Sequence, residues 1–209
     1  MRKIYIVRHG ETDNNAQNKG QSPDTPLSET GREQARLLSE RFQNIEFDHL
    51  IVSDYARTTE TAQFITDVTE KQPEYSPHLR EIKRPTQFQN VSFDTDEYRD
   101  YLKQADVNVA DPDWHFADDE NFFDVLKRVK DFFAKLETTE GDCVVVTHKR
   151  VVAMMTMYVM LGDGFTPEVW RDSKNNVIIC NTAITTIMKE GDSEEWKLHT
   201  FNDHAHFAE

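Results

Sequence analysis

The run DCVVVT at residues 142–147 limits the fold of this chain more than any other feature. Four consecutive apolar residues leave the segment without a polar face, so neither side of it can face water. Such runs are typical of strands buried in a parallel sheet that helices cover on both faces. The run therefore predicts a layered α/β fold with this segment as an inner strand.

The rest of the chain alternates short apolar runs with segments of helical periodicity. Ser28 is a candidate N-cap for a helix in which Ala35, Leu38 and Phe42 follow helical spacing. The further predicted helices are 55–68, 122–136 and 151–161, and the further predicted strands are 3–7, 49–52, 177–181, 183–189 and 196–202. The last two strands are expected to be linked through residues 191–192. This order predicts a three-layer α/β/α sandwich around a mostly parallel sheet, with a β-rich end.

One segment does not follow this alternation. Residues 73–119 lack a clear strand, although aromatic and apolar residues between 98 and 105 keep helical spacing. Residues 94–120 also hold ten acidic side chains against only two basic ones. We therefore expect one domain over residues 1–209, with a helical insertion at about 83–119 that lies over one end of the sheet and over any site there.

Composition argues against several classes of partner. The net charge is −14, whereas nucleic acids and anionic membranes require an excess of lysine and arginine. No apolar segment reaches the length that a membrane span needs. Cys143 and Cys180 each lie in an apolar run, without metal-binding spacing. We therefore expect buried thiols, no signal peptide and a cytoplasmic location, with the oligomeric state left open.

Cationic and nucleophilic side chains follow three of the predicted strands. Arg8 and His9 follow the first strand, Arg57 lies in the first turn of the helix after the second, and His148 follows DCVVVT directly. Ligands of open α/β sheets bind beyond the carboxyl ends of the strands, so we expect these side chains to meet there. Two arginines, two histidines and two helix N-termini in one place predict an anion site.

Phosphate is the anion that suits this set of groups. The planar guanidinium of arginine matches phosphoryl oxygens bidentately, and helix N–H groups add fixed partial positive charge. A neutral imidazole in that field is a competent nucleophile toward phosphorus, and neighbouring cations keep it neutral. Gly10 follows His9 and would let the backbone approach the phosphoryl oxygens closely. The residues thus predict phosphoryl transfer through a histidine.

Six segments, in order, resemble the motifs of the histidine phosphatase superfamily, in its phosphoglycerate-mutase-like branch. They are RHGET with Asn15 six residues after His9, DTPLSETGREQA, SDYARTTETA with Arg57, LREI with Glu81, DENFFDVLKRV with Glu120, and VVVTH with His148. The later segments NTAITTI and FNDHAHF are also similar to the family's last strand and tail. The resemblance covers nearly the whole chain.

The resemblance implies a role for each matching residue around the phosphoryl group. His9 would attack phosphorus in line and become a phosphohistidine. Arg8, Arg57, His148 and Asn15 would hold the equatorial oxygens and stabilise their charge. These residues together form the expected catalytic and phosphate-binding set.

The leaving group is implied to depend on Glu81, which would protonate it and then take a proton from water. Gln21 and Lys149 are further substrate-binding candidates. The chain departs from the family pattern in the link 20–24, which is one residue longer than expected, and after Glu81, where IKRPTQFQN replaces a piece of the substrate-facing wall. Lys149 and Arg150 stand where the family has a glycine, and Lys149 either adds a cation beside the phosphate or points away.

No metal or other cofactor is expected. The arginines and helix ends would supply the positive charge that magnesium supplies in other phosphoryl-transfer enzymes. His199, His204 and His206 lie around a predicted strand and its exit, without a carboxylate at ligand spacing, so we expect no metal site there.

Three functions fit these residues. The preferred one is a phosphatase that hydrolyses a phosphate monoester through a phosphohistidine on His9. A phosphoglycerate-type mutase would need cations for a second acidic group and tight exclusion of water. A non-catalytic phospholigand- or protein-binding module is disfavoured because the whole catalytic set is present. A small phosphorylated molecule or a phosphoprotein both remain open as substrate.

Overall fold

A six-stranded mixed sheet forms the centre of the molecule, in the strand order β3-β2-β4-β1-β5-β6. The computed structural model describes residues 1–191, 193 and 195–207. The strands are β1 (Arg2–Arg8), β2 (His49–Val52), β3 (Pro73–Tyr75), β4 (Cys143–Thr147), β5 (Ile184–Lys189) and β6 (Lys197–Asp203). The first four in the sheet order run parallel, and β5 and β6 pair antiparallel.

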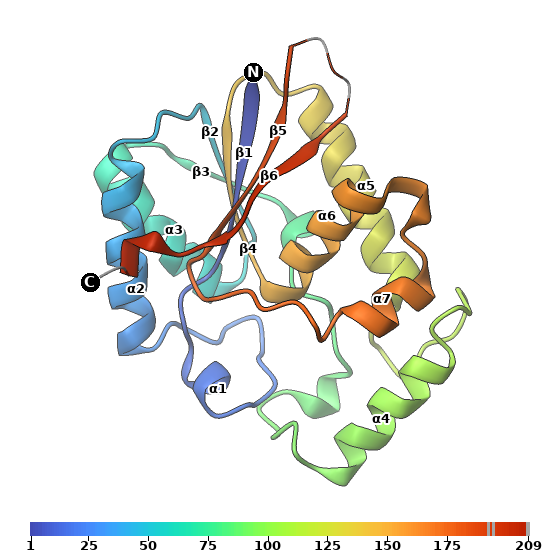
Figure 1. Cartoon of the computed structure of the whole chain (residues 1–209). Coiled ribbons are helices and arrows are strands. Elements are labelled where there is room, and N and C mark those ends of the chain that lie inside the picture. The colour runs from blue at the N-terminus through green and yellow to red at the C-terminus, as the bar shows by residue number, and fades with distance from the viewer. Residues whose placement is uncertain (192, 194, 208–209) are drawn as a thin grey trace.

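Seven α-helices and four short 3₁₀ helices surround this sheet in the part of the chain described. The α-helices are α1 (Asp13–Ala16), α2 (Glu29–Phe42), α3 (Ala56–Thr69), α4 (Asp96–Val107), α5 (Phe122–Glu137), α6 (Lys149–Leu161) and α7 (Pro167–Ser173). The 3₁₀ helices are η1 (Pro77–Leu79), η2 (Thr86–Phe88), η3 (Gly162–Gly164) and η4 (Ala205–Phe207). In Figure 1, α2 and α3 lie on one side of the sheet and α5 and α6 on the other.

The alternation of side chains along β4 explains the three layers. Val144 and Val146 pack in the cluster that contains the apolar residues of α2 and α3. Cys143 and Val145 pack in the larger cluster that contains those of α5 and α6. All four side chains are fully buried, as a strand covered on both faces requires. The expected three-layer α/β/α sandwich around a mostly parallel sheet is confirmed.

Local signals place the helices where their periodicity predicts. The Ser28 side chain accepts a hydrogen bond from the Gly31 N–H and caps α2, which buries Ala35, Leu38 and Phe42. Asn121 and Asp124 form a reciprocal capping box at the start of α5. Helices α3 and α6 begin directly after the parallel strands β2 and β4, so their N-termini point to the carboxyl edge of the sheet.

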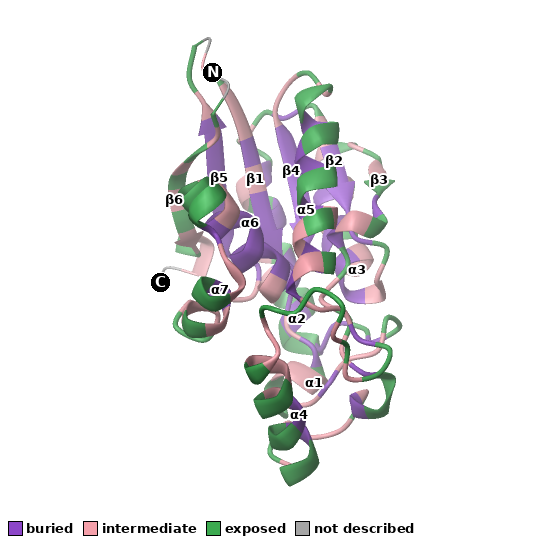
Figure 2. Ribbon diagram, turned by 90° about the vertical axis from the view of Figure 1, so that its right-hand side faces the viewer, coloured by how far each residue is buried: buried purple, intermediate pink, exposed green. Residues whose placement is uncertain are grey.

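The segment over residues 83–119 lies at that edge, at the bottom of Figure 1, and carries α4. It has a small apolar cluster of its own, in which Phe88, Tyr98 and Tyr101 are buried. The rings of Phe88 and Tyr98 meet edge to face at a centroid distance of 5.2 Å. Figure 2 shows that the outer face of α4 is exposed. Most acidic residues of this segment are exposed, whereas Asp119 is buried, and the aromatic residues form the segment's apolar cluster.

The structure differs from the sequence prediction at three places. Residues 177–181 form no strand: the Cys180 N–H donates to Asn202 Oδ1 (2.7 Å), and the Ile179 carbonyl accepts from Arg8 (2.6 Å). Side chains thus satisfy backbone groups that a ladder would otherwise use. Residues 73–75 form the short edge strand β3, and α1 and α7 were not predicted. Of the expected link at 191–192, residue 192 lies outside the described residues.

The structure also bears on the expected burial of the two cysteines and on the expected lack of a membrane span. Cys143 is buried as expected, but Cys180 is only half-buried because its segment is irregular. No helix within the described residues is long and apolar enough to cross a bilayer.

Candidate active site

A cavity of about 950 Å³ opens at the carboxyl edge of the sheet, and every predicted site residue except His148 lines it. Arg8 is the last residue of β1 and His9 follows it. Arg57 is the second residue of α3, and His148 is the N-cap residue of α6. The three strand ends bring these four side chains together, and all four are buried.

His9 is held in one orientation by its own backbone and by a neighbouring loop. Its Nδ1 donates a hydrogen bond to the Gly10 carbonyl oxygen at 2.6 Å, since a carbonyl can only accept. Asn181 Nδ2 donates to the His9 carbonyl oxygen at 2.9 Å. The proton on Nδ1 leaves the lone pair on Nε2, which is the arrangement that a nucleophilic imidazole needs.

Burial and the arginines keep both histidines neutral. Burial lowers the pKa of His9 well below its ordinary value, and the charges of Arg57 and Arg8 lower it further. The pKa of His148 is lowered for the same reasons, first by burial and then by Arg57. The sequence attributed this effect to the cations, whereas burial is the larger cause.

Buried nitrogen atoms around His9 have no hydrogen-bond partner among the described residues. They are Arg8 Nε, Arg57 Nε and His148 Nδ1. The other contacts of these groups fix them in place: Arg8 donates to the Ile179 carbonyl and Arg57 to the Ser22 carbonyl at 3.0 Å. Buried donors are normally paired, so this cluster calls for an acceptor from a ligand.

Of these three residues, Arg8 and Arg57 carry a positive charge and His148 is neutral. Burial lowers the pKa of Arg8 and of Arg57 to about 10, so both stay charged at neutral pH. His148 Nε2 lies 2.8 Å from Ser53 Oγ, and the His148 ring lies 5.2 Å from the His9 ring, centroid to centroid. The geometry fits a tetrahedral oxyanion placed between His9 and these donors.

Asn15 in helix α1 and Gln21 in the loop after it both line the cavity. The Asn15 N–H donates to Thr12 Oγ1 (3.1 Å), which in turn donates to Gln21 Oε1 (3.1 Å). Asn15 Oδ1 is buried and has no hydrogen-bond partner among the described residues, and Asn15 contributes to the cavity lining. Gln21 lines the cavity in spite of the longer link before it.

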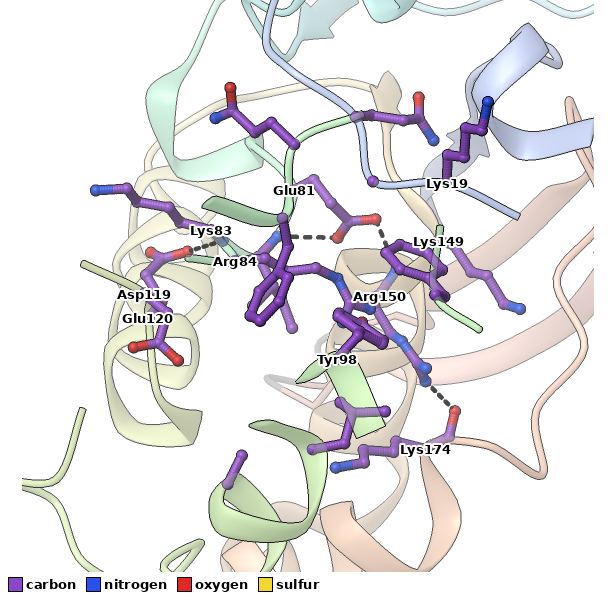
Figure 3. Close-up of a pocket in the computed structure, with 18 of the residues that line it drawn as sticks. Lys19, Glu81, Lys83, Arg84, Tyr98, Asp119, Glu120, Lys149, Arg150 and Lys174 are labelled. Atoms are coloured by element: carbon purple, nitrogen blue, oxygen red, sulfur yellow. Dashed lines mark hydrogen bonds between the residues drawn. The ribbon is translucent and has the colours of Figure 1, made fainter. Parts of the chain in front are cut away.

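Glu81 lies on the opposite wall, where two backbone N–H groups hold its carboxylate. Glu81 Oε1 accepts from the Ile82 N–H (2.9 Å) and Oε2 from the Arg150 N–H (3.4 Å). Figure 3 shows Glu81, Lys149 and Arg150 around the same space. Lys149 is half-buried and lines the cavity, which favours its reading as an added cation.

The structure gives a reason for glycine at position 10 that its place in the sequence did not suggest. A Cβ at Gly10 would lie 2.4 Å from the Gly31 carbonyl oxygen, and a Cβ at Gly31 would lie 2.0 Å from the Glu11 carbonyl oxygen. The two glycines let the loop after β1 pack directly on the first turn of α2. This backbone contact is sufficient to require glycine at position 10, and the expected approach to phosphate stays a prediction.

Sequence reasoning missed Tyr55 and Asn181. The Arg57 guanidinium lies over the Tyr55 ring at 5.1 Å, and that ring also meets the His148 ring at 5.3 Å. Tyr55 stands beside Arg57 in a motif already singled out, so proximity in sequence was the available signal. No such signal existed for Asn181, because it lies in the segment 177–181 that was expected to be a strand.

The lining of the cavity is basic, in contrast to the whole chain. Nine of the lining residues are lysine or arginine and five are aspartate or glutamate, whereas the net charge of the chain is −14. Among the described residues, no group of three or more metal-ligating side chains comes together. The cavity thus has the charge that an anion site needs, with a buried neutral histidine in its lining.

These features define a class of protein, an α/β protein with a basic cavity at the carboxyl edge of its sheet and a buried, neutral histidine in that cavity. The model of the histidine phosphatase superfamily (branch 1) matches residues 4–204, and the chain belongs to this family. The family assignment from the motifs is therefore confirmed.

Individual relatives carry different names. A probable phosphatase of Schizosaccharomyces pombe is 28% identical over 207 residues, which is 98% of this chain and 94% of that protein. A probable phosphoglycerate mutase of Photorhabdus laumondii is 44% identical over 84 residues, and the match spans only 39% of each chain. A phosphoserine phosphatase mutant of Entamoeba histolytica, solved with phosphoserine, has a TM-score of 0.77 at 21% identity, over 99% of this chain and 100% of that one. The last comparison supports the fold.

Proposed function

We propose that this protein is a phosphatase that hydrolyses phosphate monoesters of small molecules through a phosphohistidine on His9. The observation that carries the proposal is the pair of buried N–H groups on Arg8 and Arg57 that have no partner among the described residues, beside an imidazole whose Nδ1 is occupied by the Gly10 carbonyl. The family, and a relative named as a probable phosphatase that aligns over nearly the whole chain, support it.

The proposed reaction has two steps. His9 Nε2 attacks phosphorus while the bond to the leaving oxygen breaks, and Glu81 gives that oxygen a proton. Water then attacks the phosphohistidine, Glu81 takes a proton from it, and phosphate is released. The charge on the transferring oxygens is stabilised by Arg8, Arg57 and the neutral His148. No step in this scheme requires a metal ion.

A mutase is the alternative, and two observations favour it. One is the local match to relatives named as probable phosphoglycerate mutases. The other is the excess of cations along the cavity wall, which a second acidic group would need. The phosphatase is preferred because the relative that aligns over nearly the full length is named as one.

The test is phosphate release from a panel of phosphate monoesters, run beside an assay for interconversion of 2- and 3-phosphoglycerate. We expect phosphate release that persists in excess chelator and is lost in His9→Ala. Interconversion without phosphate release would establish the mutase instead. If the protein catalyses neither reaction but binds phosphorylated ligands, it would be a binding module.

Location is also a proposal. The two cysteines form no disulfide in the structure, which fits a reducing compartment, so we propose that the protein works in the cytoplasm. Fractionation of cells that express a tagged chain tests this directly.

A further inference from the structure

Two cations on the cavity wall have no carboxylate partner among the residues that the structure describes. Arg84 follows Glu81 by three residues, and Lys149 follows His148 directly. Both line the cavity, and neither takes part in a salt bridge or a side-chain hydrogen bond within the described ranges. Exposed lysines often lack partners, but Lys149 is half-buried and Arg84 is enclosed by aromatic side chains.

The Arg84 guanidinium is held over two aromatic rings. It lies 4.9 Å from the centroid of Phe93 and 5.3 Å from that of Tyr98, and these two rings stack on each other at 4.5 Å. Aromatic faces attract a cation but accept few hydrogen bonds, so the N–H groups of Arg84 remain available. Figure 3 shows Arg84 and Tyr98 beside Glu81 and Arg150.

Three of the five acidic residues that line the same cavity are engaged by other groups. Glu120 pairs with Arg128 (2.8 Å), Asp106 pairs with Lys174 (2.5 Å), and Asp119 accepts from the Phe116 N–H (3.0 Å). Glu81 is the carboxylate whose charge acts on Arg84 and Lys149 and raises the pKa of each, but it forms no salt bridge with either among the described residues. One carboxylate therefore faces several cations.

Arg150 adds fixed positive charge next to them. Its guanidinium donates to the Lys174 carbonyl and to Asn175 Oδ1 (2.9 Å), so it has neutral acceptors and no carboxylate. Burial lowers the pKa of Lys149, and the charges of Arg150 and Arg8 lower it further. A cluster of like charges in a partly buried space is unfavourable unless an anion enters it.

The position of Arg84, Lys149 and Arg150 indicates which part of a substrate these cations would contact. Glu81 is the proposed proton donor to the leaving oxygen, and its Oε2 accepts from the Arg150 N–H. Arg84, Lys149 and Arg150 all lie close enough to Glu81 for its charge to raise their pKa values, so these cations lie on the proposed leaving-group side of the site. We infer that Arg84 and Lys149 form a second anion subsite, so that the substrate is a phosphate monoester whose alcohol part carries a carboxylate or a second phosphate. This inference rests on the proposed phosphatase function.

A matched set of ligands on one carbon skeleton tests the subsite. Glycerol 1-phosphate ends in a hydroxymethyl group, 3-phosphoglycerate has a carboxylate in that place, and glycerol 1,3-bisphosphate has a second phosphate. We expect kcat/KM for phosphate release to be at least about tenfold higher with one of the two anionic ligands than with glycerol 1-phosphate. Which of the two is preferred distinguishes a carboxylate subsite from a phosphate subsite.

Variants assign the preference to residues. Arg84→Gln and Lys149→Met should each reduce the ratio of kcat/KM for the anionic ligand to that for glycerol 1-phosphate, whereas Arg84→Lys should retain most of it. Lys103→Met is the matched control, because Lys103 is exposed on α4 beside Asp100 and does not line the cavity. A thermal melt of each variant establishes that it is folded.

Binding separates this inference from the proposed function. Dissociation constants of the same three ligands for the His9→Ala protein, measured by calorimetry, do not depend on turnover. The anionic ligands should bind at least about tenfold more tightly than glycerol 1-phosphate, and the difference should shrink with added salt. Equal affinities, or a preference that Arg84→Gln and Lys149→Met leave intact, would overturn the subsite. Absence of phosphate release from all ligands, with the preference retained in binding, would overturn only the phosphatase.

Discussion

At the scale of single residues, the site depends on groups that are buried before any ligand arrives. His9 and His148 are neutral because they are desolvated, and the arginines remain charged in spite of it. An imidazole with its proton on Nδ1 and cations around its Nε2 is organised for attack on an electron-poor phosphorus. Under the proposed function, a bound phosphoryl group would supply the acceptors that Arg8 Nε and Arg57 Nε lack among the described residues.

The histidine protonation states are open to measurement by NMR. The lowered pKa values keep His9 and His148 neutral as the pH falls below about 6.5, where an ordinary histidine takes up a proton. Their imidazole ¹⁵N shifts should therefore stay constant from about pH 7.5 to about 5.5. His115 is an internal control, because its hydrogen bond to Asp124 raises its pKa above the ordinary value. Titration of His9 with a midpoint near 6.5 would contradict the account.

The roles of Arg57 and Glu81 can be separated with two kinds of substrate. Arg57→Ala should lower kcat/KM for alkyl phosphates and for p-nitrophenyl phosphate alike, by about a hundred- to a thousandfold, because it removes charge stabilisation that both reactions need. Glu81→Gln should affect alkyl phosphates far more, since p-nitrophenolate leaves without a proton. General acid catalysis typically contributes about a hundred- to ten-thousandfold. An equal loss on both substrates in Glu81→Gln would remove Glu81 from that role.

At the scale of the elements, the strand ends and helix starts that hold the site followed from the sequence. The runs 49–52 and 142–147 and the cap at Ser28 predicted β2, β4 and α2 because each has a strong local cause, either a fully apolar run or a capping side chain. The four buried polar residues of the site were predicted from their place after strands.

Elements with weak local signals were missed. The three-residue edge strand β3 exists because it pairs with β2, which sequence alone does not show. Residues 177–181 are apolar like a strand, yet Arg8 and Asn202 take their backbone groups. The packing role of Gly10 was missed because its neighbour Gly31 is distant in sequence. The boundaries of the insertion at 83–119, and its status within a single domain, stay predictions.

The contact between the loop after β1 and helix α2 gives a test of how the elements position His9. Gly31→Ala should lower the free energy of unfolding by about 1–3 kcal/mol, because its Cβ would lie 2.0 Å from the Glu11 carbonyl oxygen. Helix propensity alone would predict the opposite sign. Gly164→Ala is the control, since nothing lies within 4 Å of its Cβ, and it should change stability by less than about 0.5 kcal/mol. Denaturant titration measures both, and no destabilisation by Gly31→Ala would refute this packing.

At the scale of the whole molecule, two opposite charge distributions coexist. The chain has a net charge of −14, but the basic residues that line the cavity outnumber the acidic ones. The sheet edge, two helix N-termini and the insertion enclose that cavity, so its field is screened less by salt than that of the exposed surface. Net charge therefore excludes polyanionic partners but says little about a small anionic substrate.

The central claim is that His9 carries the phosphoryl group during turnover. The direct measurement is rapid quenching of the protein with a ³²P-labelled phosphate monoester, followed by mapping of the label. We predict a label that is stable in base and labile in acid, lies in the peptide that contains His9, is absent in His9→Ala and persists in the exposed control His204→Ala. A label that survives His9→Ala, or one that is stable in acid, would contradict the account.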